Sequence, residues 1–284
     1  MGKFKIGVMA DSFRTDFKTG VEKAAKLGAD GIQMYMVDGE LAPANMTPAK
    51  IAEVKDIIKS NGVEISAVCG DPGGHGFAIK ADNPAKIAFS KKVVEITKEL
   101  GANVVTTHIG VIPADTTCER YKVMQEACAE LGAFADSLGV SFAIETGPEK
   151  AITLKGFLDS LGNKGMKVNF DPANFVMVTD QDPVEGVEIL KDYIVHTHAK
   201  DGIMLQKTDP QVIYDFFAEG GIEDMRMSDY FLETPLGDGK VDFNAYLAAL
   251  EKIGYHGYLT VEREVGANAE ADIKKAVDFL KTKI

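Results

Sequence analysis

The sequence predicts an α/β fold, a single (β/α)8 TIM barrel, and three observations indicate it. Short, apolar, β-branched segments alternate along the chain with longer amphipathic segments. Eight short segments can be counted, and a parallel strand pair needs a crossover connection, which the amphipathic segments supply. Glycines stand shortly before many of these strands, where helices would end. Barrels of roughly 250 residues commonly form one domain, so we expect one domain over residues 1–284.

The eight expected strands, in chain order, are Lys5–Met9, Gly31–Tyr35, Glu64–Cys69, Asn103–His108, Ser141–Glu145, Lys167–Asp171, Tyr193–His198 and Tyr258–Glu262. The expected helices are Thr47–Ser60, Pro84–Leu100, Glu119–Leu138, Thr153–Leu161, Asn244–Ile253 and Ala269–Lys281. In the first helix, apolar residues recur at three- and four-residue steps, as one buried face requires: Ile51, Val54, Ile57 and Ile58. The glycines expected as C-terminal caps are Gly28, Gly62, Gly101, Gly139, Gly165 and Gly254.

The connection between the seventh and eighth expected strands is the longest in the chain. It has room for a long insertion, Lys200–Lys240, which contains a helical segment, Pro210–Ala218, and the glycine-rich turn Leu236-Gly-Asp-Gly-Lys240. Long loops in a compact barrel are usually functional. We therefore expect Asp201–Lys240 to form part of a substrate pocket, with Glu233 close to the ligand.

Composition excludes several classes of partner. The net charge is −12, which argues against nucleic-acid binding because a duplex is itself densely negative. No uncharged stretch reaches the roughly 18 apolar residues of a membrane span. The three cysteines include no Cys-x-x-Cys pair, so a reducing, cytoplasmic location is expected. The sequence leaves open whether copies of the chain form a homo-oligomer.

Four consecutive strands end in groups that can bind a metal. Strands five, six and eight end in Glu145, Asp171 and Glu262, and strand seven carries His196 and His198. Charged groups at the ends of apolar strands are costly to bury unless they are paired or bound to metal. A structural ion network is the alternative, but four such ends in succession favour a metal site. Carboxylates with imidazole and no thiolate favour Mn²⁺, with Mg²⁺, Co²⁺ or Zn²⁺ as the other candidates.

Several motifs resemble those of the xylose isomerase-like superfamily of sugar phosphate isomerases and epimerases, over essentially the whole chain. They are Ala-Ile-Glu145-Thr, Asn-Phe-Asp171-Pro-Ala-Asn174, His196-Thr-His198-Ala-Lys200-Asp201, Thr-Val-Glu262, Cys69-Gly-Asp-Pro-Gly-Gly-His75-Gly and Pro235-Leu-Gly-Asp-Gly. The resemblance implies that the metal ligands are Glu145, Asp171, His198 and Glu262, and that the two glutamates are the catalytic acid/base pair. His198 is chosen over His196 because the family's ligand precedes a Lys-Asp or similar pair by two residues.

The resemblance implies an enzyme of carbohydrate metabolism, a divalent-metal-dependent isomerase or epimerase of a sugar or sugar phosphate. Removal of a proton next to a carbonyl leaves an enediolate, whose charge a divalent cation stabilises. Two carboxylates can then exchange protons with the substrate, one abstracting and the other delivering. We expect a small sugar or polyol as the substrate.

Six further residues are candidates for substrate binding. His108 ends the fourth strand, His196 lies one layer below His198, and Lys200 and Arg263 follow strand ends, where they could bind an anion or cap loops. His75 lies in a glycine-rich loop that could cover the site, and Cys69 is a candidate pocket wall without an evident base to activate it.

Four other functions stay open at this point. An inosose isomerase or dehydratase would use the same metal chemistry on a cyclic ketone, and a subunit that cleaves carbon–glycosyl bonds belongs to the same superfamily. A metal-dependent endonuclease is disfavoured because it needs more histidines, including one where this chain has Asn174. A non-catalytic sugar-binding barrel would not require both Glu145 and Glu262.

Overall fold

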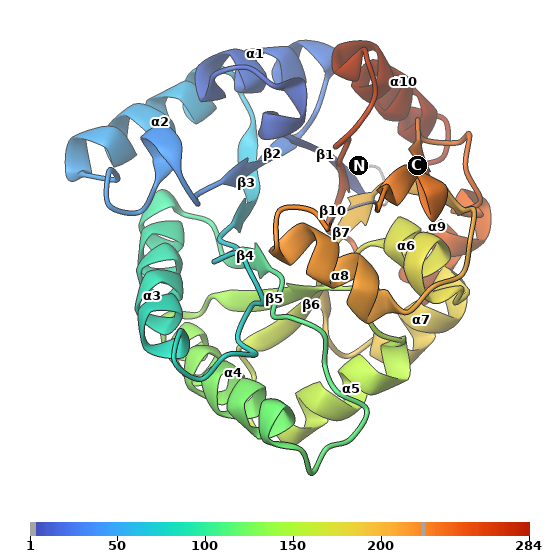
Figure 1. Ribbon diagram of the computed structural model, residues 1–284. Helices are drawn as coiled ribbons and strands as arrows, with labels where there is room; N and C mark the ends of the chain where they lie inside the picture. Colours follow the sequence, from blue (N-terminus) through green and yellow to red (C-terminus); the bar gives the residue numbers. More distant parts are fainter. Residues whose placement is uncertain (1–3, 223–224) are drawn as a thin grey trace.

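Eight parallel strands close into a barrel in the computed structural model, which describes residues 4–222 and 225–284 (Figure 1). The strands are β1 (Lys5–Met9), β2 (Gly31–Tyr35), β3 (Glu64–Cys69), β4 (Val104–Thr107), β5 (Ser141–Glu145), β6 (Met166–Phe170), β7 (Ile194–Ala199) and β10 (Tyr258–Val261). Their order around the barrel is β1-β10-β7-β6-β5-β4-β3-β2, and β1 pairs with both β10 and β2. The expected (β/α)8 barrel is therefore confirmed.

Helices surround the barrel and connect its strands (Figure 1). The longer ones are α1 (Phe17–Leu27), α2 (Pro48–Ser60), α3 (Asn83–Leu100), α4 (Glu119–Leu138), α5 (Ala151–Ser160), α7 (Pro183–Leu190), α9 (Phe243–Lys252) and α10 (Ala269–Lys281). Short helical turns are η1 (Ala10–Phe13), η2 (Gly39–Leu41), α6 (Pro172–Asn174), η3 (Phe175–Thr179) and η4 (Met227–Asp229). The helix expected over Thr47–Ser60 begins one residue later, because Thr47 is its N-cap and its side chain accepts the N–H of Lys50 before α2 begins. Within the described residues, no helix is both long and apolar enough to cross a bilayer.

Helices α1 and α7 are not singled out by the sequence patterns, and each contains an internal glycine. Glycine in a helix costs about 1 kcal/mol relative to alanine and weakens the signal. Packing explains both positions. A Cβ on Gly20 would lie 2.8 Å from the carbonyl oxygen of Ala10, and one on Gly186 would lie 3.1 Å from the ring of Phe170. These glycines therefore let the two helices approach the chain beneath them.

The expectation that six glycines cap helices is only partly correct. Gly28, Gly101 and Gly139 are left-handed C-caps of α1, α3 and α4. Gly62 and Gly254 are left-handed but stand one residue beyond the caps of α2 and α9. For Gly165 the expectation is wrong, because a Cβ there would lie 2.0 Å from the carbonyl oxygen of Gly132 in α4. Close backbone packing, rather than capping, requires that glycine.

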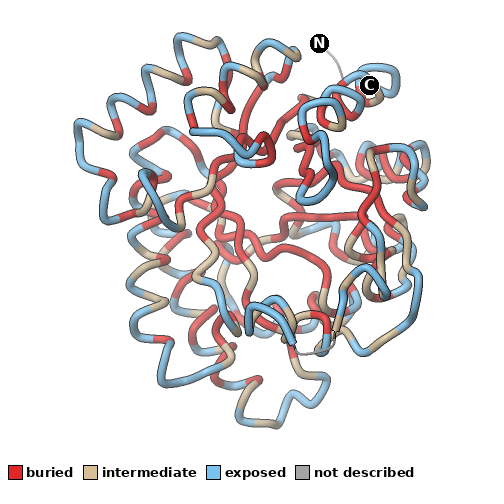
Figure 2. Tube along the Cα trace, turned by 45° about the horizontal axis from the view of Figure 1, so that its top comes forward, coloured by how far each residue is buried: buried red, intermediate tan, exposed pale blue. Residues whose placement is uncertain are grey.

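The inside of the barrel is polar near the strand ends, and the main apolar core lies between strands and helices. The Nε2 of Gln33 in β2 donates to Thr106 Oγ1 in β4 at 3.1 Å, although the two strands are not neighbours. Such contacts require side chains that point into the barrel. Alternate strand residues such as Val8, Ile32 and Phe142 join the main core. Figure 2 shows this pattern, with a buried centre and helices exposed on their outer sides.

A separate small unit lies in the chain between β7 and β10. It consists of the antiparallel strands β8 (Asp201–Met204) and β9 (Phe231–Thr234), with helix α8 (Pro210–Ala218) between them. The carboxylate of Asp201 accepts the backbone N–H groups of Gly237, Gly239 and Val241, and so fixes the glycine-rich turn. In the view of Figure 1, α8 crosses in front of the barrel interior. The helix has the bounds expected from the sequence, whereas the strand pair was not expected.

Candidate metal centre and cavity

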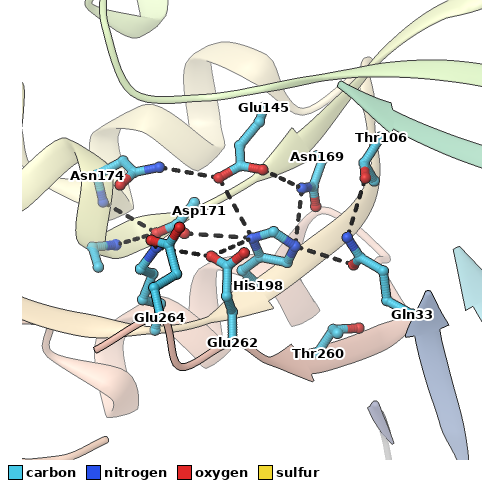
Figure 3. Close-up of polar contacts among 12 residues, drawn as sticks. Gln33, Thr106, Glu145, Asn169, Asp171, Asn174, His198, Thr260, Glu262 and Glu264 are labelled. Atoms are coloured by element: carbon cyan, nitrogen blue, oxygen red, sulfur yellow. Dashed lines mark hydrogen bonds and ion pairs between the residues drawn. The ribbon is translucent and has the colours of Figure 1, made fainter. Parts of the chain in front are cut away.

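Four side chains from the ends of consecutive strands converge at one point (Figure 3). Glu145 ends β5, Asp171 follows β6, His198 lies in β7 and Glu262 follows β10. One candidate ligand atom from each of the four lies within 4.8 Å of the others, and all four residues are buried. The Nδ1 of His198 stands 3.6, 3.4 and 3.3 Å from the nearest carboxylate oxygens of Glu145, Asp171 and Glu262, respectively.

Two atoms of this cluster suit a cation. The Oδ2 of Asp171 and the Nδ1 of His198 are buried and have no hydrogen-bond partner, a costly state for polar groups. The Oδ1 of Asp171 accepts the N–H groups of Ala173 and Asn174 at 2.7 and 3.1 Å, which leaves Oδ2 to face the cluster. Three carboxylates and one imidazole form a donor set that could hold a divalent metal.

The other ring nitrogen of His198 is held inside the barrel. Its Nε2 lies 3.1 Å from Gln33 Oε1, which can only accept a hydrogen bond, and 3.2 Å from Asn169 Nδ2, which can only donate one and also donates to Glu145. When the proton is on Nε2, the lone pair of Nδ1 is available to a metal. Hydrogen-bond partners of metal-binding histidines commonly fix the ring in this form. Gln33 is not among the residues expected at the site, and neither is Asn169, whose Nδ2 donates to Glu145 Oε2 at 3.3 Å. The available signal was a buried-strand pattern interrupted by an amide side chain, in Gly31–Tyr35 for Gln33 and in Met166–Phe170 for Asn169.

The two glutamates have different neighbours. Glu145 Oε1 accepts a hydrogen bond of 3.2 Å from the neutral amide of Asn174. Glu262 Oε2 instead accepts one of 2.9 Å from the ammonium group of Lys200. Burial alone would raise the pKa of Glu262, but the charges of His198 and Lys200 outweigh it and hold the pKa well below its usual range. The carboxylate of Glu262 is therefore held in its ionised form.

The two cations expected to bind an anion are already paired. Lys200 contacts Glu262 and Glu264, and its Nζ lies 3.8 Å from Glu233 Oε2. Arg263 donates to Glu233 Oε1 at 2.6 Å and to Asp272 Oδ2 at 2.9 Å. Both side chains are buried. Lys200 borders the cavity described below, whereas the guanidinium of Arg263 is turned towards its two carboxylate partners.

His108 and Cys69 also border the cavity beside the cluster, which is described below. The Nδ1 of His108 lies 2.8 Å from Asp71 Oδ2, and its Nε2 lies 3.7 Å from Glu145 Oε1. Burial would lower the pKa of His108, but the charges of Glu145 and Asp71 raise it to about 10. Burial raises the pKa of the Cys69 thiol, which disfavours the reactive thiolate. Cys69 therefore serves as part of the cavity wall and not as a nucleophile.

His196 and His75 contact other parts of the chain. His196 lies beside His198, and its ring nitrogens stand 2.8 Å from Asn169 Oδ1 and 2.9 Å from Thr260 Oγ1. It therefore packs one layer below the cluster, within the barrel. The Nε2 of His75 lies 2.7 Å from Glu219 Oε1, just after α8. His75 thus ties the loop after β3 to the end of α8, beside the cavity.

A cavity of about 650 Å³ borders the cluster. Glu145, Glu262, His108 and Lys200 line one part of it, and residues of α8 and β9 line another, among them Ile213, Phe217, Leu232 and Glu233. The segment expected to help form a pocket, Asp201–Lys240, does contribute to this wall. A metal at the cluster would be reached by a small molecule from the cavity.

Comparison with known proteins agrees with this architecture. The family model described as a xylose isomerase-like TIM barrel matches residues 21–283. No curated protein matches the sequence. Among solved structures, a xylose isomerase domain protein from Planctomyces limnophilus is similar with a TM-score of 0.81 and 23% identity, over 98% of this chain and 96% of that one.

Two more solved structures share the fold at lower identity. The probable 3-DHS dehydratase from Bacillus anthracis, involved in petrobactin synthesis, has a TM-score of 0.75 and 16% identity, over 98% of this chain and 99% of that one. D-psicose 3-epimerase from Clostridium cellulolyticum H10, solved with D-tagatose, has a TM-score of 0.72 and 16% identity, over 99% of both chains. At such identities the likeness establishes the fold alone.

Proposed function

This chain belongs to the xylose isomerase-like TIM barrel family, and from that premise we propose that it is a divalent-metal-dependent sugar isomerase or epimerase. The observation that carries the proposal is the buried cluster of Glu145, Asp171, His198 and Glu262 beside a cavity, in which Asp171 Oδ2 and His198 Nδ1 have no hydrogen-bond partner. We further propose Mn²⁺ as the ion, a single domain and a cytoplasmic location.

The metal ligands in this proposal are the four residues of the cluster. A divalent cation bound there would supply the positive charge that stabilises an enediolate. Asp171 and His198 act only as ligands, because their remaining atoms are held by backbone N–H groups and by Gln33. Glu145 and Glu262 would, in addition to binding the metal, carry out the proton transfer.

Glu145 is the last residue of β5, and Glu262 is the first residue after β10. In the barrel, β6 and β7 lie between these two strands. A ketose whose reacting carbon lies between the two carboxylates would lose its proton to one and regain a proton from the other. His108, held by Asp71, lies close enough to Glu145 to donate a hydrogen bond to a substrate oxygen beside it. One pair of carboxylates then serves both directions of the reaction.

A dehydratase that acts on a cyclic ketone is the second candidate. Its first step is the same proton removal next to a carbonyl, followed by loss of a hydroxyl group from the adjacent carbon. The probable 3-DHS dehydratase has the same fold, so the fold is compatible with this reaction as well. Its product contains a new carbon–carbon double bond, so product analysis separates it from an epimerase.

The test is solvent exchange with Mn²⁺-loaded protein in D₂O, using ketohexoses, pentulose phosphates and inosose, followed by NMR. We expect one deuterium at the carbon next to the carbonyl, together with an isomerised product. Metal-free protein and the Asp171→Ala variant serve as controls and should exchange nothing above background. Absence of exchange for every ketone with fully loaded protein would contradict the proposal.

A further inference from the structure

The cavity wall changes character with distance from the cluster. Glu145, Glu262 and His108 make one part polar, whereas α8, β9 and the segment after β10 contribute most of the large apolar side chains, beside the carboxylates of Glu233 and Glu264. Three of the apolar lining residues are strongly exposed, Phe217 at 62%, Val265 at 47% and Leu232 at 46%. Large apolar side chains without cover are left for a ligand to contact.

These apolar residues come from separate segments but meet at one cavity. Phe216 and Phe217 belong to α8, Leu232 to β9, Met177 to η3, and Val265 follows β10. Single exposed apolar residues are normal on a protein surface, whereas a gathered set marks a binding region. The volume of about 650 Å³ lies within the roughly 300–1,000 Å³ of pockets for drug-sized ligands. It exceeds what one six-carbon sugar fills.

The same cavity is poorly suited to a phosphate group. Its lining includes the carboxylates of Asp71, Glu145, Glu233, Glu262 and Glu264. Among the described lining residues, the cationic groups are already paired, Lys200 with Glu262 and Glu264, and His108 with Asp71. A phosphate would meet repulsion from the carboxylates without a free cation to offset it.

We propose that the natural substrate is an unphosphorylated keto sugar or keto polyol that carries an apolar substituent. The ketone end would face the cluster, and the substituent would lie against Phe217, Leu232 and Val265. This inference rests on the proposed function and adds to it the class of substrate.

The test compares three probes: D-fructose, its benzyl ether at the terminal hydroxyl, and its terminal phosphate ester. Calorimetry with Mn²⁺-loaded protein gives each Kd. Burial of ~60 Å² of the benzyl group at ~25 cal/mol per Å² corresponds to about tenfold tighter binding of the ether than of D-fructose. The phosphate ester should bind no tighter than D-fructose.

Two variants locate the effect. Phe217→Ser should remove most of the preference for the ether. Ile152→Ser is the matched control, because Ile152 lies in α5, outside the cavity lining, and is 61% exposed against 62% for Phe217. It should leave the preference unchanged. The alternative is that a second copy of this chain covers the same apolar residues. Light scattering of both variants, which measures the oligomeric state, tests this alternative.

The outcomes separate this inference from the proposed function. Equal affinity for ether and sugar, tighter binding of the phosphate ester, or a preference that survives Phe217→Ser would overturn the substrate class. A change from dimer to monomer in Phe217→Ser alone would assign the apolar residues to an interface and overturn it as well. Deuterium exchange of D-fructose alone would still support the isomerase chemistry in those cases. Preferential binding of the ether without exchange of any ketone would contradict the isomerase chemistry instead.

Discussion

His198 Nε2 lies 3.1 Å from Gln33 Oε1, although the two residues are 165 positions apart in the chain and sit on strands that are not neighbours. The contact crosses the inside of the barrel, and Gln33 is held in turn by Thr106 (Figure 3). Because an amide oxygen only accepts hydrogen bonds, Gln33 favours the form of His198 with the proton on Nε2, while the nearby Nδ2 of Asn169 has Glu145 as its other acceptor. The opposite nitrogen is then free to bind a metal.

Replacement of Gln33 should weaken metal binding. Loss of a partner behind a ligating histidine typically costs about 10–100-fold in metal affinity, and we expect Gln33→Ala to fall in this range for Mn²⁺. The measurement is a competition titration with a fluorescent chelator. Thr106→Val is the control, since it keeps Gln33 and removes only the more distant bond, and its effect should be much smaller. Unchanged affinity in Gln33→Ala would show that the contact does not orient the ligand.

The metal site itself should bind about one divalent ion per chain. Asp171→Ala and His198→Ala should abolish this binding, because each removes a ligand whose free atom faces the cluster. Elemental analysis after reconstitution with Mn²⁺ or Co²⁺ measures it. Binding to the folded state alone also stabilises, by about 2.7 kcal/mol at ~100 times the Kd, so a chelator should lower the Tm of the wild-type protein. An unchanged Tm together with no bound ion would contradict the site.

Loss of Lys200 should destabilise the fold strongly. Its side chain is 4% exposed, and its ammonium group contacts the carboxylates of Glu262 and Glu264. Removing one partner of a buried ion pair costs about 3–5 kcal/mol, and Lys200→Met should lose this much in urea unfolding. The matched control is Lys207→Met, because Lys207 pairs with Asp180 at the surface, where the side chains are 77% and 65% exposed. That change should cost less than about 1 kcal/mol.

The sequence allowed the fold and the cluster to be predicted because both depend on local patterns. Glu145, Asp171 and Glu262 directly end apolar strands, and alternation of strands and helices implies that such ends share one rim. Gln33 could not be predicted in this way, since its partner becomes apparent only once barrel closure brings β2 opposite β7. Arg263 also looks like a free cation in the sequence, and only the folded chain brings Glu233 and Asp272 to it.

Glu149 should make stability depend on pH. Burial raises its pKa to about 8, against a hydrogen bond from Ile112 N–H that lowers it. The folded protein then keeps this carboxyl protonated while the unfolded chain ionises from its ordinary pKa of about 4.3 upwards. Between these values the free energy of unfolding should fall with rising pH, by about 1.4 kcal/mol per pH unit from this group.

Glu149→Gln removes that ionisation, so its stability relative to the wild type should increase from pH 5 to pH 8 and level off above. Urea unfolding of both proteins across this range is the measurement. Parallel pH profiles would mean that Glu149 ionises normally in the folded protein.

The last prediction concerns the two glutamates, whose roles can be separated from metal binding. Glu145→Gln and Glu262→Gln should each lose a large part of kcat in the solvent-exchange assay, since one positioned acid or base contributes ~10²–10⁴-fold. Both residues are also proposed ligands, so metal occupancy is measured on the same samples. Full occupancy without turnover assigns proton transfer to the replaced carboxylate, whereas lost occupancy assigns a ligand role.

The surroundings of the two glutamates predict which of the two variants should lose more stability and metal occupancy. Lys200 stabilises a charged Glu262, and a neutral amide in Glu262→Gln leaves that ammonium without one partner. Glu145 accepts hydrogen bonds only from the neutral amides of Asn174 and Asn169. Its charged neighbours, His108 and His198, lie farther away, at 3.7 and 3.6 Å, so Glu145→Gln should disturb its surroundings less. We therefore expect Glu262→Gln to lower stability and metal occupancy more, and Glu145→Gln to give the cleaner loss of turnover. Near-wild-type turnover in either variant with metal bound would exclude that glutamate as the acid/base group, and His108 would be the next residue to replace.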